Sequence, residues 1–304
     1  MRIVRKDFVD IGKLLALAAC AWVLPERFWA AFCRRFAAIE SGVQRTLTRG
    51  SVEHIRRACS FHPVRTGPGG IHSGALAAHY LERVHILACY RPWNWTPAIE
   101  LHGFQHLTDA LSRGGGAILW VGNFYFSSLV TKMAFQRRGV DVTHLSRPTH
   151  GFSRTEFGIR WLNRIRTRVE DRYLHERVVV GSGEKGESHR RLRRRLATNG
   201  VVSITVGQWA KEVVRTPLLA AQLSLATGPA RLAIETGASL LPVFTVADGR
   251  GAFHVYLESP LTVRDPGNVD GSIRAIVREY AARLEPYVLS YPELWRTWSR
   301  LRFE

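Results

Sequence analysis

The 304-residue sequence lacks most of the patterns that bind cofactors or form disulfide frameworks. Its four cysteines form no CxxC pair and no close cluster with histidine, which argues against a zinc site and against disulfide bonds. No GxGxxG motif and no Walker loop occurs, because the glycine triplet at 114–116 precedes an apolar run, whereas a phosphate loop follows a strand. We therefore predict no metal site and no bound cofactor.

Long hydrophobic runs are also absent near the N-terminus. The apolar run there covers only residues 14–24, which is short of the roughly 20 residues that span a bilayer. Basic residues precede it as in a signal peptide, but no convincing small-residue cleavage site follows. We expect a retained segment that lies on the bilayer surface or packs on the domain, and an ordinary core helix fits its length equally well. On a surface, the residues facing anionic headgroups would be Arg2, Arg5, Lys6 and Lys13.

Lysine is scarce although the formal net charge is +18, so arginine carries nearly all of the positive charge. The lysines are Lys6, Lys13, Lys132, Lys185 and Lys211. Guanidinium groups suit phosphate recognition better than ammonium groups do, which favours an anionic membrane surface or an acidic carrier protein as partner. A GC-rich genome would enrich arginine as well. No zinc finger, helix-turn-helix or stacking platform is present, so we expect no nucleic-acid partner.

The pattern of apolar residues changes near Pro92. Between residues 7 and 91, apolar residues recur at three- and four-residue spacing, and no strand pattern appears. Beyond residue 92, short apolar runs bounded by glycine alternate with helical segments, as is typical of α/β proteins. We therefore predict an α/β fold, with a central, mostly parallel or mixed sheet flanked by helices and with a helical N-terminal extension. The predicted division is a membrane-associated helical segment at 1–92 and an α/β domain at 93–304.

The individual elements follow from the same periodicities. Strands are predicted at 116–121, 140–145, 178–180, 201–206, 239–246 and 253–257. Internal helices are predicted at 102–114, 127–139, 189–200 and 227–237, each ending in a glycine that favours a left-handed C-cap, and a last helical stretch at 272–298. A Gly/Pro-bearing stretch at 62–70 predicts a loop.

Several motifs occur in a fixed order along the second part of the chain. They are HGFQHLTDALSRGGGAILW at 102–120, VGNFYF at 121–126, HLSRP at 144–148, NGVVSITVGQ at 199–208, TGPARLAIETGASLLPVF at 227–244 and YPELWRTW at 291–298. In this order the chain resembles the lauroyl/myristoyl acyltransferases of lipid A synthesis, a branch of the lysophospholipid acyltransferase superfamily. The resemblance covers roughly two thirds of the chain, and the ordered set is more specific than any single motif.

The resemblance implies a catalytic dyad that this sequence lacks. In the family, a histidine acts as general base on an acceptor hydroxyl that attacks a thioester, and a carboxylate five residues later orients the imidazole. Aligned on the Gly-Asn pair at 122–123, these positions hold Trp120 and Tyr125, and a shift by one residue gives Val121 and Phe126. None of the twelve histidines has an acidic residue five positions on. The chain thus resembles a divergent member of the family that lacks the His-x4-Asp/Glu dyad.

Other residues near the expected site are candidate replacements. His150 and His144 flank Arg147 at the end of a predicted strand, where binding groups of open α/β sheets collect, and they are our first candidates for a base. Asn123 is a third catalytic candidate, as holder of an oxyanion, although a buried turn would use it for its own backbone. The predicted substrate-binding residues are Gly122, Tyr125, Arg147, Arg154 and Arg164.

Two local pairs are expected to have structural roles. His102 and His106 are expected on one helical face as surface or outer-shell groups. Ser127 and Ser128 are expected to cap the helix that they begin, because no GxSxG elbow surrounds them.

The resemblance implies transfer of an acyl group to a hydroxyl or amine acceptor, lipid or lipid-like. The donor would be an acyl carrier protein or coenzyme A thioester, which is a substrate and not a cofactor. The site of action would be the cytoplasmic face of the inner membrane, with the chain peripheral or anchored by its N-terminal segment. The alternative is an inactive family member that binds lipid or acts as a scaffold, with Trp120 filling the former catalytic pocket.

Overall fold

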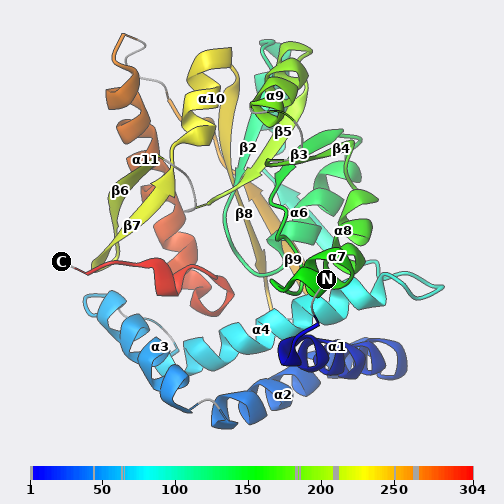
Figure 1. The fold of residues 1–304 in the computed structure, drawn as a ribbon. Coiled ribbons are helices and arrows are strands. Elements are labelled where there is room, and N and C mark those ends of the chain that lie inside the picture. The colour runs from blue at the N-terminus through cyan, green and yellow to red at the C-terminus, as the bar shows by residue number, and fades with distance from the viewer. Residues whose placement is uncertain are drawn as a thin grey trace.

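The computed structural model describes residues 3–43, 45–62, 64, 66–181, 184, 186–207, 212–249, 251–262 and 267–303. Its centre is a seven-stranded sheet of order β1-β9-β8-β2-β5-β3-β4 (Figure 1). The strands are β1 (Ala98–His102), β2 (Ala117–Val121), β3 (Val142–Ser146), β4 (Glu176–Val179), β5 (Val201–Thr205), β8 (Ser239–Ala247) and β9 (Ala252–Leu257). A separate hairpin pairs β6 (Val213–Leu218) with β7 (Ala221–Ala226).

Helices surround the sheet and form the whole N-terminal part. The first four are α1 (Arg5–Val23), α2 (Trp29–Val43), α3 (Arg45–Ala58) and α4 (Pro68–Ala88). The others are α5 (Gln105–Ser112), α6 (Ser127–Gln136), α7 (Glu156–Arg160), α8 (Leu162–Asp171), α9 (Glu187–Ala197), α10 (Gly228–Thr236) and α11 (Val269–Ser290). Short 3-10 turns lie at Glu26–Phe28, Pro292–Leu294 and Trp298–Arg300.

The sheet is mixed, which confirms the predicted fold class. Strands β2, β3, β4, β5 and β8 run parallel, β9 is antiparallel to β8, and β1 is parallel to β9. Right-handed crossovers place α6 and α8 on one face and α9 and α10 on the other. In agreement, α6 contacts α8, while α10 contacts α9 and α11. The carboxyl end of β2 points toward α4, which crosses below the sheet (Figure 1).

All six predicted strands are present, and three others escaped prediction. The segment 98–102 forms the edge strand β1, and Gly103, with φ of 73°, turns the chain into α5. The expected helix at 102–114 therefore begins three residues later, and His102 and His106 do not share a helical face. The strands β6 and β7 lie in a stretch for which no strand was predicted. Ser127 does not cap α6, since its hydroxyl donates to the Phe124 carbonyl at 2.8 Å.

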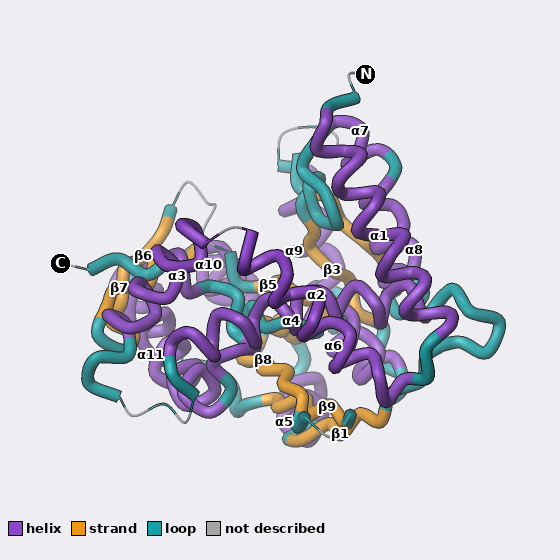
Figure 2. Tube along the Cα trace, turned by 90° about the horizontal axis from the view of Figure 1, so that it is seen from below, coloured by secondary structure: helices purple, strands orange, loops and turns teal. Residues whose placement is uncertain are grey.

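Helix α1 turns its acidic side chains inward. The Asp7 carboxylate accepts hydrogen bonds from the Thr155 hydroxyl and from the Val4 amide. Asp10 accepts one from the Ser153 hydroxyl at 2.7 Å. These contacts fasten α1 beside α7 and α8, as Figure 2 shows. Among the described residues, we find no helix whose length and apolar character suffice to span a bilayer.

Only some of the basic residues that we expected to face the headgroups are exposed. Lys6 is exposed, with a contact to Asp10, and Arg5 is exposed as well. Lys13 instead pairs with Glu40 at 2.7 Å, because its side chain runs between α1 and α2 and not toward solvent. Arg2 lies outside the described residues.

A buried histidine on α4 makes the stability of the fold depend on pH. The His85 ring stacks on Trp95 with centroids 4.1 Å apart, and burial lowers its pKa to about 3, although Glu82 acts in the opposite sense. Below the unfolded value of about 6.5, the unfolded chain binds a proton that the folded chain refuses until about pH 3. The free energy of unfolding should therefore fall as pH drops from 6.5, by on the order of 2–3 kcal/mol at pH 4.5.

Urea unfolding of the wild type and of His85→Phe at a series of pH values tests this dependence. Between pH 6.5 and 4.5, the free energy of unfolding should depend less steeply on pH in the variant. The difference in slope corresponds to at most one proton taken up on unfolding. Identical slopes would show that His85 is not held neutral by the fold.

Candidate active site

The loop between β2 and α6 lies where the family motif predicts the catalytic residues. Its Gly122 amide donates to the Val243 carbonyl at 2.7 Å, which ties the loop to β8. The Asn123 side chain donates to the Thr297 hydroxyl at 3.3 Å, and its carbonyl accepts from the Arg296 amide at 3.1 Å. These contacts hold the loop against β8 and the C-terminal segment, so the Gly122 amide is engaged, whereas the Asn123 side-chain amide keeps a second N–H, and its role as an oxyanion holder stays a prediction.

The two positions of the missing dyad carry no proton acceptor. Trp120 is 1% exposed, and its ring lies 4.1 Å from that of Tyr280 on α11, measured between centroids. Tyr125 is half-buried, and the Arg296 guanidinium lies over its ring at 4.7 Å. Burial raises the pKa of Tyr125, although Arg296 opposes the shift, so the phenol stays protonated at neutral pH. If this chain has a general base, it lies elsewhere.

Beside this loop lies a network of buried charges, which we call the charge network. Glu82 on α4 accepts two hydrogen bonds from the Arg166 guanidinium at 3.2 Å, and its oxygens lie 3.0 and 3.3 Å from Arg296. It also accepts from the Phe126 amide at 3.0 Å, so α4 holds the start of α6 directly. The charge network comprises Glu82, Lys132, Arg166, Glu170, Arg177 and Arg296.

The second carboxylate of the network, Glu170 on α8, is fully buried. It contacts Lys132 at 2.7 Å, the Arg166 Nε at 2.8 Å and Arg177 at 3.0 Å. Burial alone would raise its pKa, but His150 and Lys132 hold the pKa well below its usual range. Glu170 is therefore ionised. Four cationic side chains surround two carboxylates, so the network has an excess of positive charge.

His150 forms a dyad with Glu170. Its Nε2 lies 2.9 and 3.0 Å from the two carboxylate oxygens. Since an ionised carboxylate only accepts hydrogen bonds, Nε2 carries the proton, and Nδ1 of the neutral ring carries the lone pair that can accept one. Burial lowers the pKa of His150, although Glu170 acts against it, and the side chain is still 24% exposed. A neutral imidazole oriented by a carboxylate is what general-base catalysis requires.

His144, the other predicted base, has a different environment. It lies within β3, is 6% exposed, and its Nδ1 is 2.8 Å from the Ser203 hydroxyl on β5. Burial and the nearby Lys132 lower its pKa well below the ordinary value. A histidine enclosed in the sheet does not reach a substrate, so His144 does not enter the function proposed below.

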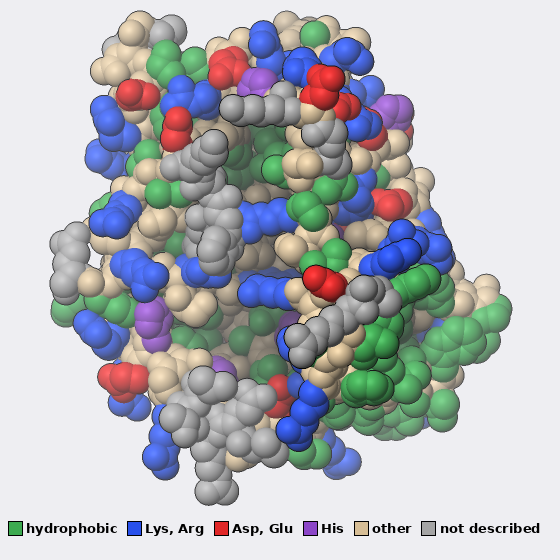
Figure 3. Space-filling view, viewed as in Figure 1, with side chains coloured by type: hydrophobic (Ala, Val, Ile, Leu, Met, Phe, Trp, Pro, Cys, Tyr) green, Lys and Arg blue, Asp and Glu red, His purple; other side chains and the backbone are tan. Residues whose placement is uncertain are grey.

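The predicted arginines are exposed at the surface. Arg147 follows β3 and lies against Gly207, and its pKa is lowered by burial and by the nearby Arg300. Arg154 and Arg164 are exposed, and the Arg164 guanidinium lies 6.0 Å from the Trp161 ring centroid. Figure 3 shows that this side of the molecule is hollowed near its middle and that Lys and Arg side chains gather there.

Sequence reasoning missed His79, which lies on α4 facing Tyr125 with ring centroids 6.1 Å apart. Burial, Arg83 and Arg296 lower its pKa well below 6.5, and no described residue forms a hydrogen bond with its ring nitrogens. The sequence feature that could have pointed to α4 is the pair of charged residues at 82–83 inside an otherwise apolar helix. His79 is thus a second neutral histidine near the β2 loop.

A cavity of about 450 Å³ lies elsewhere, between α9 and α10. Its lining includes Arg190, Arg193, Arg194 and Glu235, and also Gly115 and Thr236, which precede β2 and β8. It therefore opens at the amino ends of the strands. Ligands of open α/β sheets bind beyond the carboxyl ends, where the β2 loop and His150 lie.

Comparison with known proteins identifies the family. The model of the bacterial lipid A biosynthesis acyltransferases matches residues 76–303. Phosphatidylinositol mannoside acyltransferases of two Mycobacterium tuberculosis strains, H37Rv and CDC 1551, are each 26% identical over 206 residues, or 64% of this chain and 56% of theirs. The chain thus spans little more than half the length of these curated relatives. The family match includes the β2 loop, His150 and Glu170. This chain belongs to the bacterial lipid A biosynthesis acyltransferase family.

Proposed function

We propose that this protein transfers an acyl group from an acyl-CoA or acyl carrier protein thioester to a hydroxyl or amine of a lipid-like acceptor at a membrane surface. The observation that carries the proposal is the His150–Glu170 pair in a family member whose β2 loop has no histidine. Family membership indicates the reaction class, and the pair provides the proton acceptor that the reaction needs.

In the proposed reaction, His150 carries the proton from the acceptor to the leaving thiolate. The acceptor oxygen or nitrogen attacks the thioester carbonyl carbon while His150 Nδ1 takes its proton. The carbon–sulfur bond then breaks, and the departing thiolate takes that proton back from the imidazolium. Glu170 stabilises the imidazolium because the carboxylate is already ionised and bonded to Nε2. No covalent acyl-enzyme is needed.

The exposed arginines support a phosphate-bearing donor. Coenzyme A and the carrier protein's phosphopantetheine both carry phosphate, which a guanidinium fork binds through paired hydrogen bonds. Arg147, Arg154 and Arg164 lie along the chain on either side of His150 and on α8, and are exposed. We therefore assign donor binding to these arginines and acyl transfer to His150.

An apolar stripe on α1 supports action at a membrane surface. Phe8, Leu15 and Trp22 recur every seven residues, and are 68%, 66% and 47% exposed. Figure 3 shows hydrophobic side chains gathered over α1 at the lower right. Because Asp7 and Asp10 are buried, this helix offers a lipid surface apolar groups and the exposed cations Arg5 and Lys6.

Replacing Phe8, Leu15 and Trp22 together by serine should weaken binding to anionic vesicles at least tenfold, since each apolar side chain contributes about 1.5–3 kcal/mol on burial. Co-sedimentation with phosphatidylglycerol vesicles measures the change. Phe61→Ser is the matched control, because Phe61 is 84% exposed at the end of α3. Equal loss in both variants, or no loss in the triple variant, would exclude α1 as the lipid-binding face.

The activity itself is tested with purified protein, anionic vesicles and radiolabelled acyl-CoA or acyl carrier protein, offered lyso-lipid and glycolipid acceptors. We expect a labelled lipid product from at least one donor–acceptor pair. Vesicle and thioester binding without product would favour the alternative, a lipid-binding family member whose site Trp120 has closed.

A further inference from the structure

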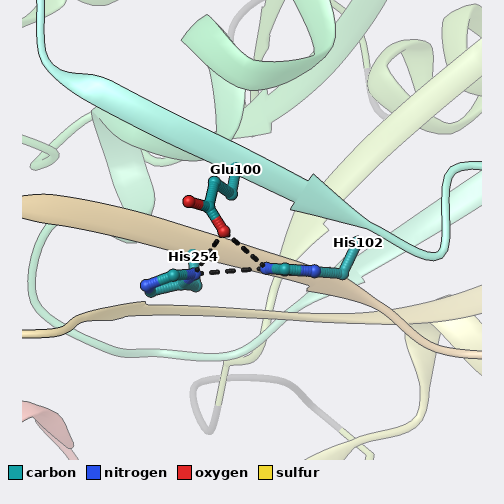
Figure 4. A group of neighbouring side chains, drawn as sticks. All are labelled: Glu100, His102 and His254. Carbon is teal, nitrogen blue, oxygen red and sulfur yellow. Dashed lines mark hydrogen bonds and ion pairs between the residues drawn. The ribbon is translucent and has the colours of Figure 1, made fainter.

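Three possible metal ligands meet at the edge of the main sheet, on strands β1 and β9 (Figure 4). Glu100 and His102 are two residues apart on β1, so their side chains point to the same face. His254 on β9 is the register partner of Glu100. Sequence reasoning predicted no metal site because it searched near neighbours, whereas 152 residues separate His102 from His254.

The spacing of the three ligand atoms fits a tetrahedral metal ion. The His102 Nε2 lies 3.2 Å from the His254 Nδ1 and 3.6 Å from a Glu100 carboxylate oxygen, and that oxygen lies 3.3 Å from the His254 Nδ1. For bonds of about 2.0–2.1 Å, two corners of a tetrahedron are separated by about 3.3–3.4 Å. The three distances scatter around that value.

The surroundings keep these ligands in place. The His102 ring stacks on Tyr256 with centroids 4.6 Å apart and planes 14° apart. His254 is 19% exposed, whereas Glu100 is 62% exposed in its side chain. The imidazoles lie within hydrogen-bond distance of each other, and the same Glu100 oxygen lies near both, so all three ligand atoms converge on one point.

We propose that Glu100, His102 and His254 bind one divalent transition-metal ion of the zinc class. Two imidazoles and one carboxylate are a usual zinc ligand set, and a fourth position remains for water. The ion joins the edge strand β1 to β9 and neutralises Glu100, which stabilises the edge of the sheet. This site is separate from the His150–Glu170 dyad and does not depend on the proposed acyl transfer.

Isothermal titration of the EDTA-treated, tag-free protein with Zn²⁺ tests the proposal, with Co²⁺ absorption as a second readout of tetrahedral geometry. We expect one ion per chain, and at least a 100-fold weaker affinity in His102→Ala and in His254→Ala. His106→Ala, on the neighbouring helix α5, is the matched control and should bind like the wild type. Zn²⁺ should also raise the Tm of the wild type but not of the two variants.

The metal-free variants are first compared with the metal-free wild type by circular dichroism and Tm, so that a folding defect is recognised. Should His254→Ala alone fail to fold, Glu100→Gln gives the same test at an exposed position. Absence of saturable Zn²⁺ binding would overturn the proposal, as would affinity that is unchanged in the His102 and His254 variants.

Discussion

Replacing His150 by alanine is expected to lower the rate of acyl transfer by about two to four orders of magnitude, the usual contribution of a general base. The variant loses the only imidazole that a described carboxylate orients at the carboxyl end of the sheet. Because the side chain is 24% exposed, its removal leaves a small water-accessible gap and not a buried cavity. Initial rates with labelled thioester, at matched vesicle concentration, give the comparison.

Two further histidine variants make this result specific. His189→Ala removes an exposed histidine on α9 and should leave the rate unchanged. His79→Ala tests the second neutral histidine near the β2 loop. A large loss in His79→Ala with no loss in His150→Ala would move the base to α4 and refute our assignment.

The pH dependence of the rate follows from the same residue. A base must be neutral to accept a proton, and burial places the pKa of His150 below 6.5. We therefore expect kcat to be level near neutrality and to fall only at pH values below 6.5.

Replacing Glu170 by glutamine is expected to have the largest effect on stability, a loss of about 3–5 kcal/mol in the free energy of unfolding. The carboxylate is fully buried against Lys132, Arg166 and Arg177. Without it, these cations remain in a low-dielectric environment with too little negative charge. Urea unfolding at pH 7.5 measures the difference, because both carboxylates of the charge network are ionised there.

The adjacent acid provides a matched control. Asp171 is 48% exposed in its side chain and contacts only Arg177 among the cations of the network, at 2.6 Å. Asp171→Asn should therefore cost less than about 1 kcal/mol, as exposed ion pairs do. Similar losses in the two variants would mean that the network does not hold the fold together.

The sequence predicted the sheet well because its parallel central strands are short, apolar and bounded by glycine. It missed β1 because the segment at 98–102 carries a glutamate and a histidine on an edge strand, where only one side of the strand is paired. The hairpin β6–β7 escaped because its residues alternate in burial and do not form a continuous apolar run. Edge and surface strands give weak signals for this reason.

The site was predictable only in part. The position of His150 after a strand was visible in the sequence, whereas its partner Glu170 lies 20 residues away on a helix rich in arginine. A search for acids at a fixed spacing of five residues finds dyads within one loop only. Pairing between a loop and a helix depends on how α8 packs beside α6 and α4, which local sequence patterns do not report.

Local sequence patterns also do not report what surrounds Trp120. In one of the two registers considered, this residue replaces the family's histidine, and the structure shows its ring packed on Tyr280. A histidine introduced there would lie under α11 and not beside His150. We therefore attribute the altered site to a relocated base, not to a base that one substitution in the β2 loop would restore.

Chemical rescue of His150→Gly by added imidazole tests the central claim most directly, because free imidazole can occupy the vacated position and accept the proton. With acyl thioester, acceptor and vesicles present, we predict that the transfer rate of His150→Gly rises with imidazole concentration and saturates, while the wild type and His79→Gly do not respond. A folded His150→Gly variant that keeps the wild-type rate without imidazole, or that binds thioester but is not rescued, would contradict the assignment of His150 as the base.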